Sequence, residues 1–112
     1  MRTVQDAMAL MFQRGKTNMT TEDLEGLASL SDYAADEARR LSVVCEGLGC
    51  LIDYDGRNPT GAGNFRDGGD VSTLVFALGH SFDVLAGMVD VGGRATYEAN
   101  RRRLCELQGV KP

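Results

Sequence analysis

The feature that most constrains this chain is an uninterrupted 3-4 alternation of apolar residues that begins at Leu24. Such an alternation is typical of a helix that packs along a nearly antiparallel partner helix. Thr20 and Asp23 stand at the spacing of an N-terminal cap just before it. We therefore predict one long helix over residues 21–52, about 48 Å in length. Eight of the nine seam positions are apolar, and the nine are Leu24, Leu27, Ser31, Ala34, Ala38, Leu41, Cys45, Leu48 and Ile52.

The segments on either side of this helix also favour helices. Thr3 is placed to cap a short amphipathic helix over residues 3–14. Residues 53–69 hold five glycines and the only internal proline without any periodicity, so we expect a glycine-rich loop there. Residues 71–91, with Asp70 as the expected cap, are apolar over so wide an arc that the helix should be buried on more than one side.

The C-terminal part of the chain contains an expected break and a last helix. Gly92 and Gly93 should end the preceding helix, because each glycine weakens a helix by about 1 kcal/mol relative to alanine. A basic helix is predicted over residues 94–107, ended by Gly109. Few β-branched residues alternate with polar ones, so no sheet is expected.

These elements predict an all-α single domain over residues 1–112, built as a long antiparallel helical hairpin with short flanking helices. The long helix has a second apolar flank, and one hairpin covers only one seam of each helix. Each exposed Leu or Val forgoes about 1.5–3 kcal/mol of burial. We therefore expect a homodimer that completes a four-helix core. The flank consists of Leu30, Tyr33, Val44 and Leu51.

Composition narrows the class of protein further. The 112 residues are 43% hydrophobic and 25% charged, with a net charge of −4, as in an ordinary soluble domain. The chain has three cysteines, an odd number that does not form a closed set of disulfides, and no segment resembles a signal peptide. Both features favour a reducing cytoplasm. Residues 71–91 are long enough to cross a membrane, but Asp83 in their middle argues against it. Met1 and Met19 are both candidate starts.

No catalytic constellation stands out. His80 and Asp83 share a helix face, but no nucleophile has a fixed spacing from them, so an exposed polar stripe is the simpler interpretation. Cys45 and Cys50 are too widely spaced on a helix for a zinc clamp, and Cys105 is distant in sequence. We predict no enzyme activity, cofactor or metal. A small metal or thiol protein that uses His80 and the cysteines is an alternative.

Two groups of residues are candidates for binding another protein. The loop places an aromatic residue among basic and amide side chains, a combination typical of a protein anchor. The acidic flank of the long helix suits a basic partner surface, and complementary charge speeds association. The loop group is Arg57, Asn58, Phe65 and Arg66, and the acidic group is Asp32, Asp36 and Glu37.

A run of three arginines near the C-terminus offers another alternative, a nucleic-acid accessory protein that grips phosphates with Arg101, Arg102 and Arg103. The overall acidic charge and the lack of interleaved aromatic residues argue against it. The simpler interpretation is a favourable charge near a helix C-terminus, with Glu98 one turn away as an ion-pair partner.

Residues 74–86, LVFALGHSFDVLA, resemble helices of small uncharacterised proteins from proteobacterial chromosomes and prophages. The resemblance implies a small all-helical fold and no activity. Immunity proteins, antitoxins and phage inhibitors of bacterial defence include small helical proteins that act by binding another protein, and the comparison with this chain is an analogy alone. We therefore expect a non-catalytic, acidic helical regulator or inhibitor that binds another protein and masks its surface.

Overall fold

The computed structural model describes residues 3–57 and 68–111. All regular secondary structure in these ranges is helical, which confirms the all-α class. The elements are α1 (Val4–Gly15), the 3-10 turn η1 (Lys16–Asn18), α2 (Thr21–Ala28), α3 (Leu30–Arg57) and α4 (Gly68–Leu107).

The first two helices begin where the caps predict. The Thr3 hydroxyl accepts the backbone N–H of Asp6 at 3.1 Å, and the Asp6 carboxylate accepts the N–H of Thr3 at 3.3 Å. Thr20 and Asp23 make the same reciprocal pair at 3.0 and 2.9 Å. Each capping box satisfies backbone donors that the first helical turn leaves without partners.

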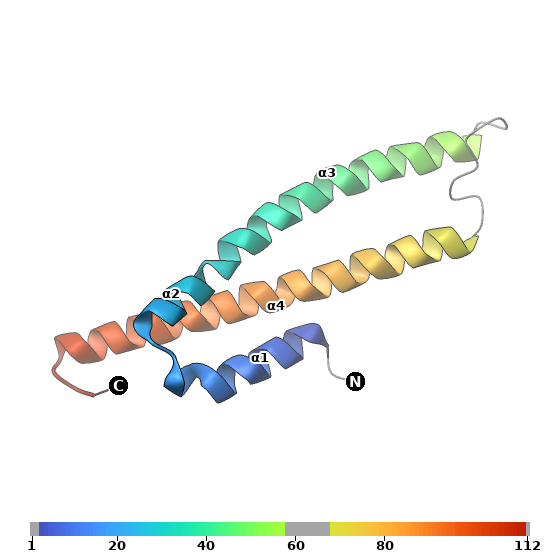
Figure 1. The fold of residues 1–112 in the computed structure, drawn as a ribbon. Coiled ribbons are helices and arrows are strands. Elements are labelled where there is room, and N and C mark those ends of the chain that lie inside the picture. Colours follow the sequence, from blue (N-terminus) through green and yellow to red (C-terminus); the bar gives the residue numbers. More distant parts are fainter. Residues whose placement is uncertain (1–2, 58–67, 112) are drawn as a thin grey trace.

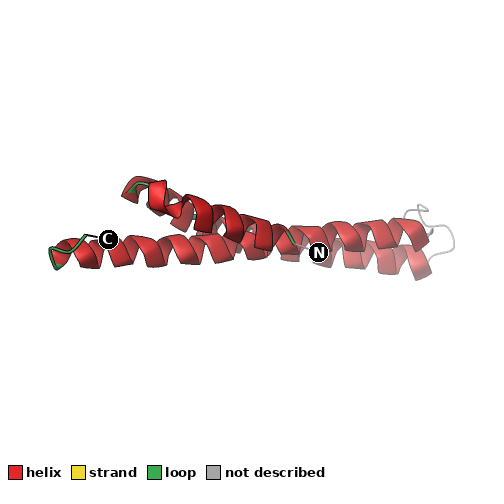
Figure 2. Cartoon of the chain, turned by 90° about the horizontal axis from the view of Figure 1, so that it is seen from below, coloured by secondary structure: helices red, strands yellow, loops and turns green. Residues whose placement is uncertain are grey.

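Helix α4 is the axis on which the other helices pack (Figure 1). Helix α3 runs beside one half of α4 in the opposite direction, and α1 lies along α4 on the side away from α3 (Figure 1). The molecule measures 72 × 28 × 14 Å, and Figure 2 shows the same elongated shape from below. Since a helix with side chains is about 10–12 Å wide, the smallest dimension shows that much of the chain is one layer of helices.

The main cluster of buried side chains lies where α1, α2 and α4 meet, and Ala34 of α3 and Leu85 of α4 are buried outside it. Its residues are Phe12, Leu24, Val91, Ala95 and Ala99. Leu24 is the largest side chain that is fully buried, at 0% exposure. Along the hairpin the seam residues of α3 are only half-buried, because α4 covers them from one side; they are Leu41, Cys45, Leu48 and Ile52.

The predicted single helix over 21–52 is wrong in two respects. The chain bends at Ser29, which ends α2, and α3 continues beyond residue 52 to Arg57. The Ser29 hydroxyl donates to the carbonyl oxygen of Gly26 at 2.6 Å. A serine that bonds back to the preceding turn competes with the helical ladder and bends it. The expected loop over 53–69 is therefore too long at both ends, since α4 begins at Gly68.

The predicted break at the glycine pair is also wrong, because α4 is continuous through both glycines and joins the helices predicted over 71–91 and 94–107. Gly92 is buried against the start of α3, where a Cβ would come within 2.9 Å of the Ser31 backbone nitrogen. Close packing of α3 thus compensates for the weak helix propensity of glycine. Asp70 lies inside the first turn of α4 and does not cap it.

Candidate functional site

The N-terminus of α1 is fixed to α4 by a single carboxylate. Asp83 accepts the backbone N–H of Val4 at 2.9 Å and that of Gln5 at 3.3 Å. With the Thr3 cap, the first three donors of α1 are therefore satisfied, and a negative charge lies at the positive end of the helix dipole. Asp83 positions α1 and does not orient His80, which is exposed one turn earlier.

Close packing behind Asp83 holds the same two helices together. Gly87 of α4 is buried beneath α1, and a Cβ there would lie 2.6 Å from the sulfur of Met8 and 3.2 Å from the Cα of Gln5. Only glycine permits this approach without displacing α1.

A buried ion-pair cluster fixes the other end of α1. Glu98 is 5% exposed and accepts from Arg101 at 2.7 and 3.0 Å and from Arg102 at 3.2 Å. Hydrogen bonding by Arg101 holds the pKa of Glu98 down at about 2, although burial acts in the opposite direction; Arg102 lowers the pKa further. Arg102 also donates to the carbonyl oxygen of Lys16 at 2.7 Å and to that of Met19. Of the three arginines predicted as phosphate-binding candidates, Arg102 ties α4 to the end of α1, Arg101 pairs with Glu98 within α4, and Arg103 is exposed.

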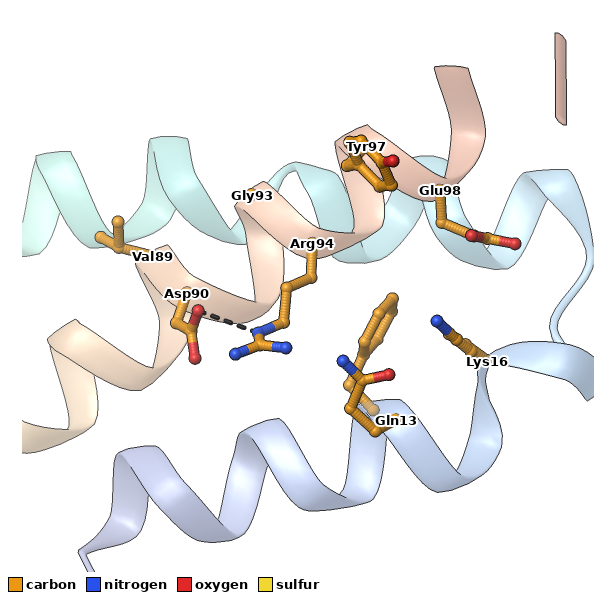
Figure 3. Close-up of a pocket in the computed structure, with 9 residues that line it drawn as sticks. Gln13, Lys16, Val89, Asp90, Gly93, Arg94, Tyr97 and Glu98 are labelled. Carbon is orange, nitrogen blue, oxygen red and sulfur yellow. Dashed lines mark hydrogen bonds and ion pairs between the residues drawn. The ribbon is translucent and has the colours of Figure 1, made fainter. Parts of the chain in front are cut away.

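A groove of about 500 Å³ runs between α1 and α4 (Figure 3). Gln13 of α1 and Lys16 of η1 reach into it, and Arg94 extends toward α1 from α4, anchored by Asp90 at 3.0 Å. The buried ring of Phe12 and the exposed ring of Tyr97 add apolar walls. The groove combines aromatic surface with cationic side chains, which suits an aromatic side chain of a binding partner.

Long apolar side chains cover the outside of the hairpin. Helix α3 exposes a flank of Tyr33, Val44, Leu51 and Tyr54. These residues follow helical spacing on a face distinct from the seam that packs on α4. Helix α4 exposes a second set, Val75, Phe76, Phe82 and Val89. Large apolar side chains exposed in this number are typical of protein–protein or membrane interaction sites.

The described residues include only part of the two predicted partner-binding groups. Asn58, Phe65 and Arg66 lie outside the described residues. Arg57 ends α3 and pairs with Asp53 at 3.1 Å. Asp36 and Glu37 are paired within α3, with Arg39 at 2.5 Å and Arg40 at 2.7 Å, whereas Asp32 is exposed in the first turn. These ion pairs neutralise much of the charge of the acidic flank. The apolar side chains beside them are therefore better candidates for contact with a partner than the carboxylates are.

Neither the cysteines nor the histidine form a metal site in the described part of the chain. Cys45, Cys50 and Cys105 are free thiols. Within residues 3–57 and 68–111, no three His, Cys, Asp or Glu side chains come close enough together to hold a metal ion.

Sequence reasoning missed the groove and the role of Asp83. Gln13, Lys16 and Arg94 become neighbours only when α1 folds back on α4, and no local pattern indicates that pairing. The exposed residues Val75, Phe82 and Val89 of α4 could be found from the sequence, since they belong to an apolar seam that one α3 helix cannot cover.

Comparison with known proteins gives no match to this chain among protein-family models, curated proteins or solved structures.

Within the described residues, one helix is long and apolar enough to cross a membrane. Gly69–Leu107 contains an 18-residue window with a mean hydropathy of 1.5, of which 17% is buried.

Proposed function

We propose that this protein is a non-catalytic helical interaction protein that self-associates through its hairpin and covers a surface of another protein, as a regulator or inhibitor does. The observation that carries the proposal is the row of large apolar side chains exposed along both α3 and α4. A hairpin that remained alone would keep this surface in water, at about 25 cal/mol for each Å² of apolar area.

The size of the exposed surface supports self-association. The accessible surface is 7958 Å², against about 6,000 Å² for a compact monomer of this mass. The radius of gyration is 20.4 Å, against about 13 Å for a compact chain of this length. A domain normally needs two packed layers of secondary structure to enclose a core. A second copy of the hairpin is the simplest source of the missing layer.

The α3 flank supports binding of a second kind of protein. It combines two tyrosines with aliphatic residues, and tyrosine is enriched where proteins bind one another. The ion pairs of Asp36 and Glu37 lie along the same helix and supply a polar rim. A rigid surface of this kind is able to mask a partner without chemistry of its own.

Affinity capture from cells that express the protein, followed by mass spectrometry, tests this function. The bait is compared with a variant that carries Val44→Glu and Leu51→Glu on the α3 flank, with circular dichroism as the control for folding. We expect a stoichiometric partner with the unaltered protein and its loss with the variant. A set of captured proteins that is the same for both baits would refute binding through this flank.

The purified protein answers the question of self-association separately. Its molar mass, measured by light scattering on a size-exclusion column, should be twice the 12.1 kDa of one chain. A mass of one chain at micromolar concentration would show that self-association is wrong, whatever the capture experiment finds.

A further inference from the structure

Helix α4 carries an exposed heptad seam in addition to the seam that packs on α3. Val75, Phe82 and Val89 recur every seven residues and are 58%, 53% and 53% exposed. Four residues after each of them stands a small residue, and these are Gly79, Ala86 and Gly93. We call these six residues the α4 stripe. This 4-3 alternation is the pattern of a helix that packs along another helix.

The alternation of large and small residues matches the stripe to a second copy of itself. When two identical helices pack antiparallel, with the twofold axis midway between Phe82 and Ala86, Phe82 of each copy faces Ala86 of the other. The same alignment places Val75 opposite Gly93, and Val89 opposite Gly79. Each large side chain then meets a small residue. A parallel pair would place phenyl ring against phenyl ring and leave voids between glycines, which close-packed interiors do not tolerate.

The same alignment supplies an occupant for the groove between α1 and α4. Phe76 follows the stripe residue Val75 and is 77% exposed. In the antiparallel pair, the partner's Phe76 is level with Gly92 and Gly93 of this chain. Residues that follow the large stripe positions lie on one common side of such a pair. On that side Asp90 and Tyr97 line the groove, at the same level along α4 (Figure 3).

We propose that two copies of this chain associate through the α4 stripe in this antiparallel alignment, and that the partner's Phe76 enters the α1–α4 groove of each copy. The proposal rests on the self-association stated above and specifies its interface. In this arrangement, α4 lies between α3, α1 and the second α4. Tyr97 and the Arg94 guanidinium provide the contacts that an inserted phenyl ring favours.

The surface available is sufficient for a stable dimer. The stripe from Val75 to Gly93 is about 27 Å long, and the chain exposes roughly 2,000 Å² more than a compact monomer. A standard interface removes only about 800 Å² from each partner. A lipid bilayer is a poorer occupant of the same face, because Asp83 and Asp90 lie beside the stripe and a carboxylate is strongly unfavourable at mid-bilayer.

Glycine substitutions provide a test that does not endanger the fold. A Cβ at Gly79 would meet no atom within 4 Å in the single chain, and the same holds for Gly47 on α3. Gly79→Leu therefore leaves the monomer intact but occupies the space of the partner's Val89, while Gly47→Leu is the matched control. By sedimentation, we expect dimers for the unaltered protein and for Gly47→Leu. Gly79→Leu should raise the dissociation constant by roughly 100-fold or more.

Disulfide trapping tests the alignment itself. In a background with Cys45, Cys50 and Cys105 replaced by serine, one chain carries Val75→Cys and another carries Gly93→Cys. After mixing and mild oxidation, the disulfide should join the two kinds of chain. A parallel pair would instead join Val75→Cys chains to each other.

The outcomes separate this interface from the broader function. If Gly79→Leu still forms dimers, or if Val75→Cys chains join to each other, the stripe alignment is wrong although self-association stands. If the unaltered protein is a monomer, both fail. If it is a monomer that floats with phosphatidylcholine–phosphatidylglycerol vesicles, the stripe contacts lipid and the proposal is overturned.

Discussion

The Asp83 carboxylate accepts the backbone N–H of Val4 at 2.9 Å, across 79 residues of sequence. One side chain in the middle of α4 thereby fixes the N-terminus of α1 against α4, after the Thr3 cap has set where α1 begins. Gly87, one turn later, brings the two helices into close contact. Because the groove of Figure 3 exists only while α1 is in this place, the contact between Asp83 and α1 also maintains the groove.

Replacing Asp83 should loosen α1 without unfolding the rest of the chain. Asp83→Ala leaves the N–H groups of Val4 and Gln5 without their acceptor and removes a favourable charge from a helix N-terminus, a loss of about 1–2 kcal/mol. Hydrogen exchange should become faster in α1 and stay unchanged in α3. His80→Ala, on the same helix, is the control. Unaltered protection of α1 in Asp83→Ala would contradict this role.

Gly92 should be the glycine of α4 that tolerates an added methyl group least. Gly92→Ala directs a Cβ against the backbone nitrogen and hydroxyl of Ser31, so α3 has to move, which costs about 1–3 kcal/mol. Gly49→Ala meets no atom within 4 Å and improves helix propensity, so it should stabilise by up to about 1 kcal/mol. Urea unfolding measures both. Equal stabilities for the two variants would show that α3 does not pack against Gly92.

The loss of stability when a leucine is replaced by alanine should depend on whether that leucine is buried. Leu24→Ala removes a fully buried side chain from the core shared by α1, α2 and α4, at a cost of about 2–5 kcal/mol. Leu51→Ala removes an exposed side chain of α3 and should change the free energy of unfolding by about 0.5 kcal/mol or less. Thermal unfolding of the two variants checks this. Similar losses would place the core along the hairpin instead.

Local sequence patterns were sufficient for the features that local contacts determine. The capping boxes at Thr3 and Thr20 and the all-α class follow from neighbouring residues, and the structure contains them. Gly109 likewise ends the last helix with a φ of +70°, and the N–H of Val110 closes the turn on the carbonyl of Cys105 at 2.8 Å.

The errors arose where a distant contact overrides local propensity. Glycines predict a break at residue 92, but the approach of Ser31 makes glycine the residue that packing requires there. Ser29 sits in an apolar-periodic stretch that predicts a continuous helix, yet its hydroxyl bonds back to Gly26 and bends the chain. The groove and the Asp83 contact depend on how α1 folds back on α4, which no periodicity within either helix specifies.

The pKa of Glu98 gives stability a defined dependence on pH. Arg101 and Arg102 hold this pKa at about 2 in the folded chain, below the ordinary 4.5. A depressed carboxylate pKa contributes stability that is complete above about pH 4.5 and is lost as the pH falls toward 2, because the unfolded chain takes up a proton at this carboxylate in that range while the folded chain does not. At neutral pH, Glu98→Gln should therefore be less stable than the unaltered protein by on the order of 2 kcal/mol.

The difference in Tm between Glu98→Gln and the unaltered protein should shrink as the pH falls from 4.5 to 2. Glu46→Gln, which removes an exposed carboxylate from α3, is the control for the loss of one carboxylate. A Glu98→Gln difference that stays constant over this pH range would show that the carboxylate is not held in its charged form by the two arginines.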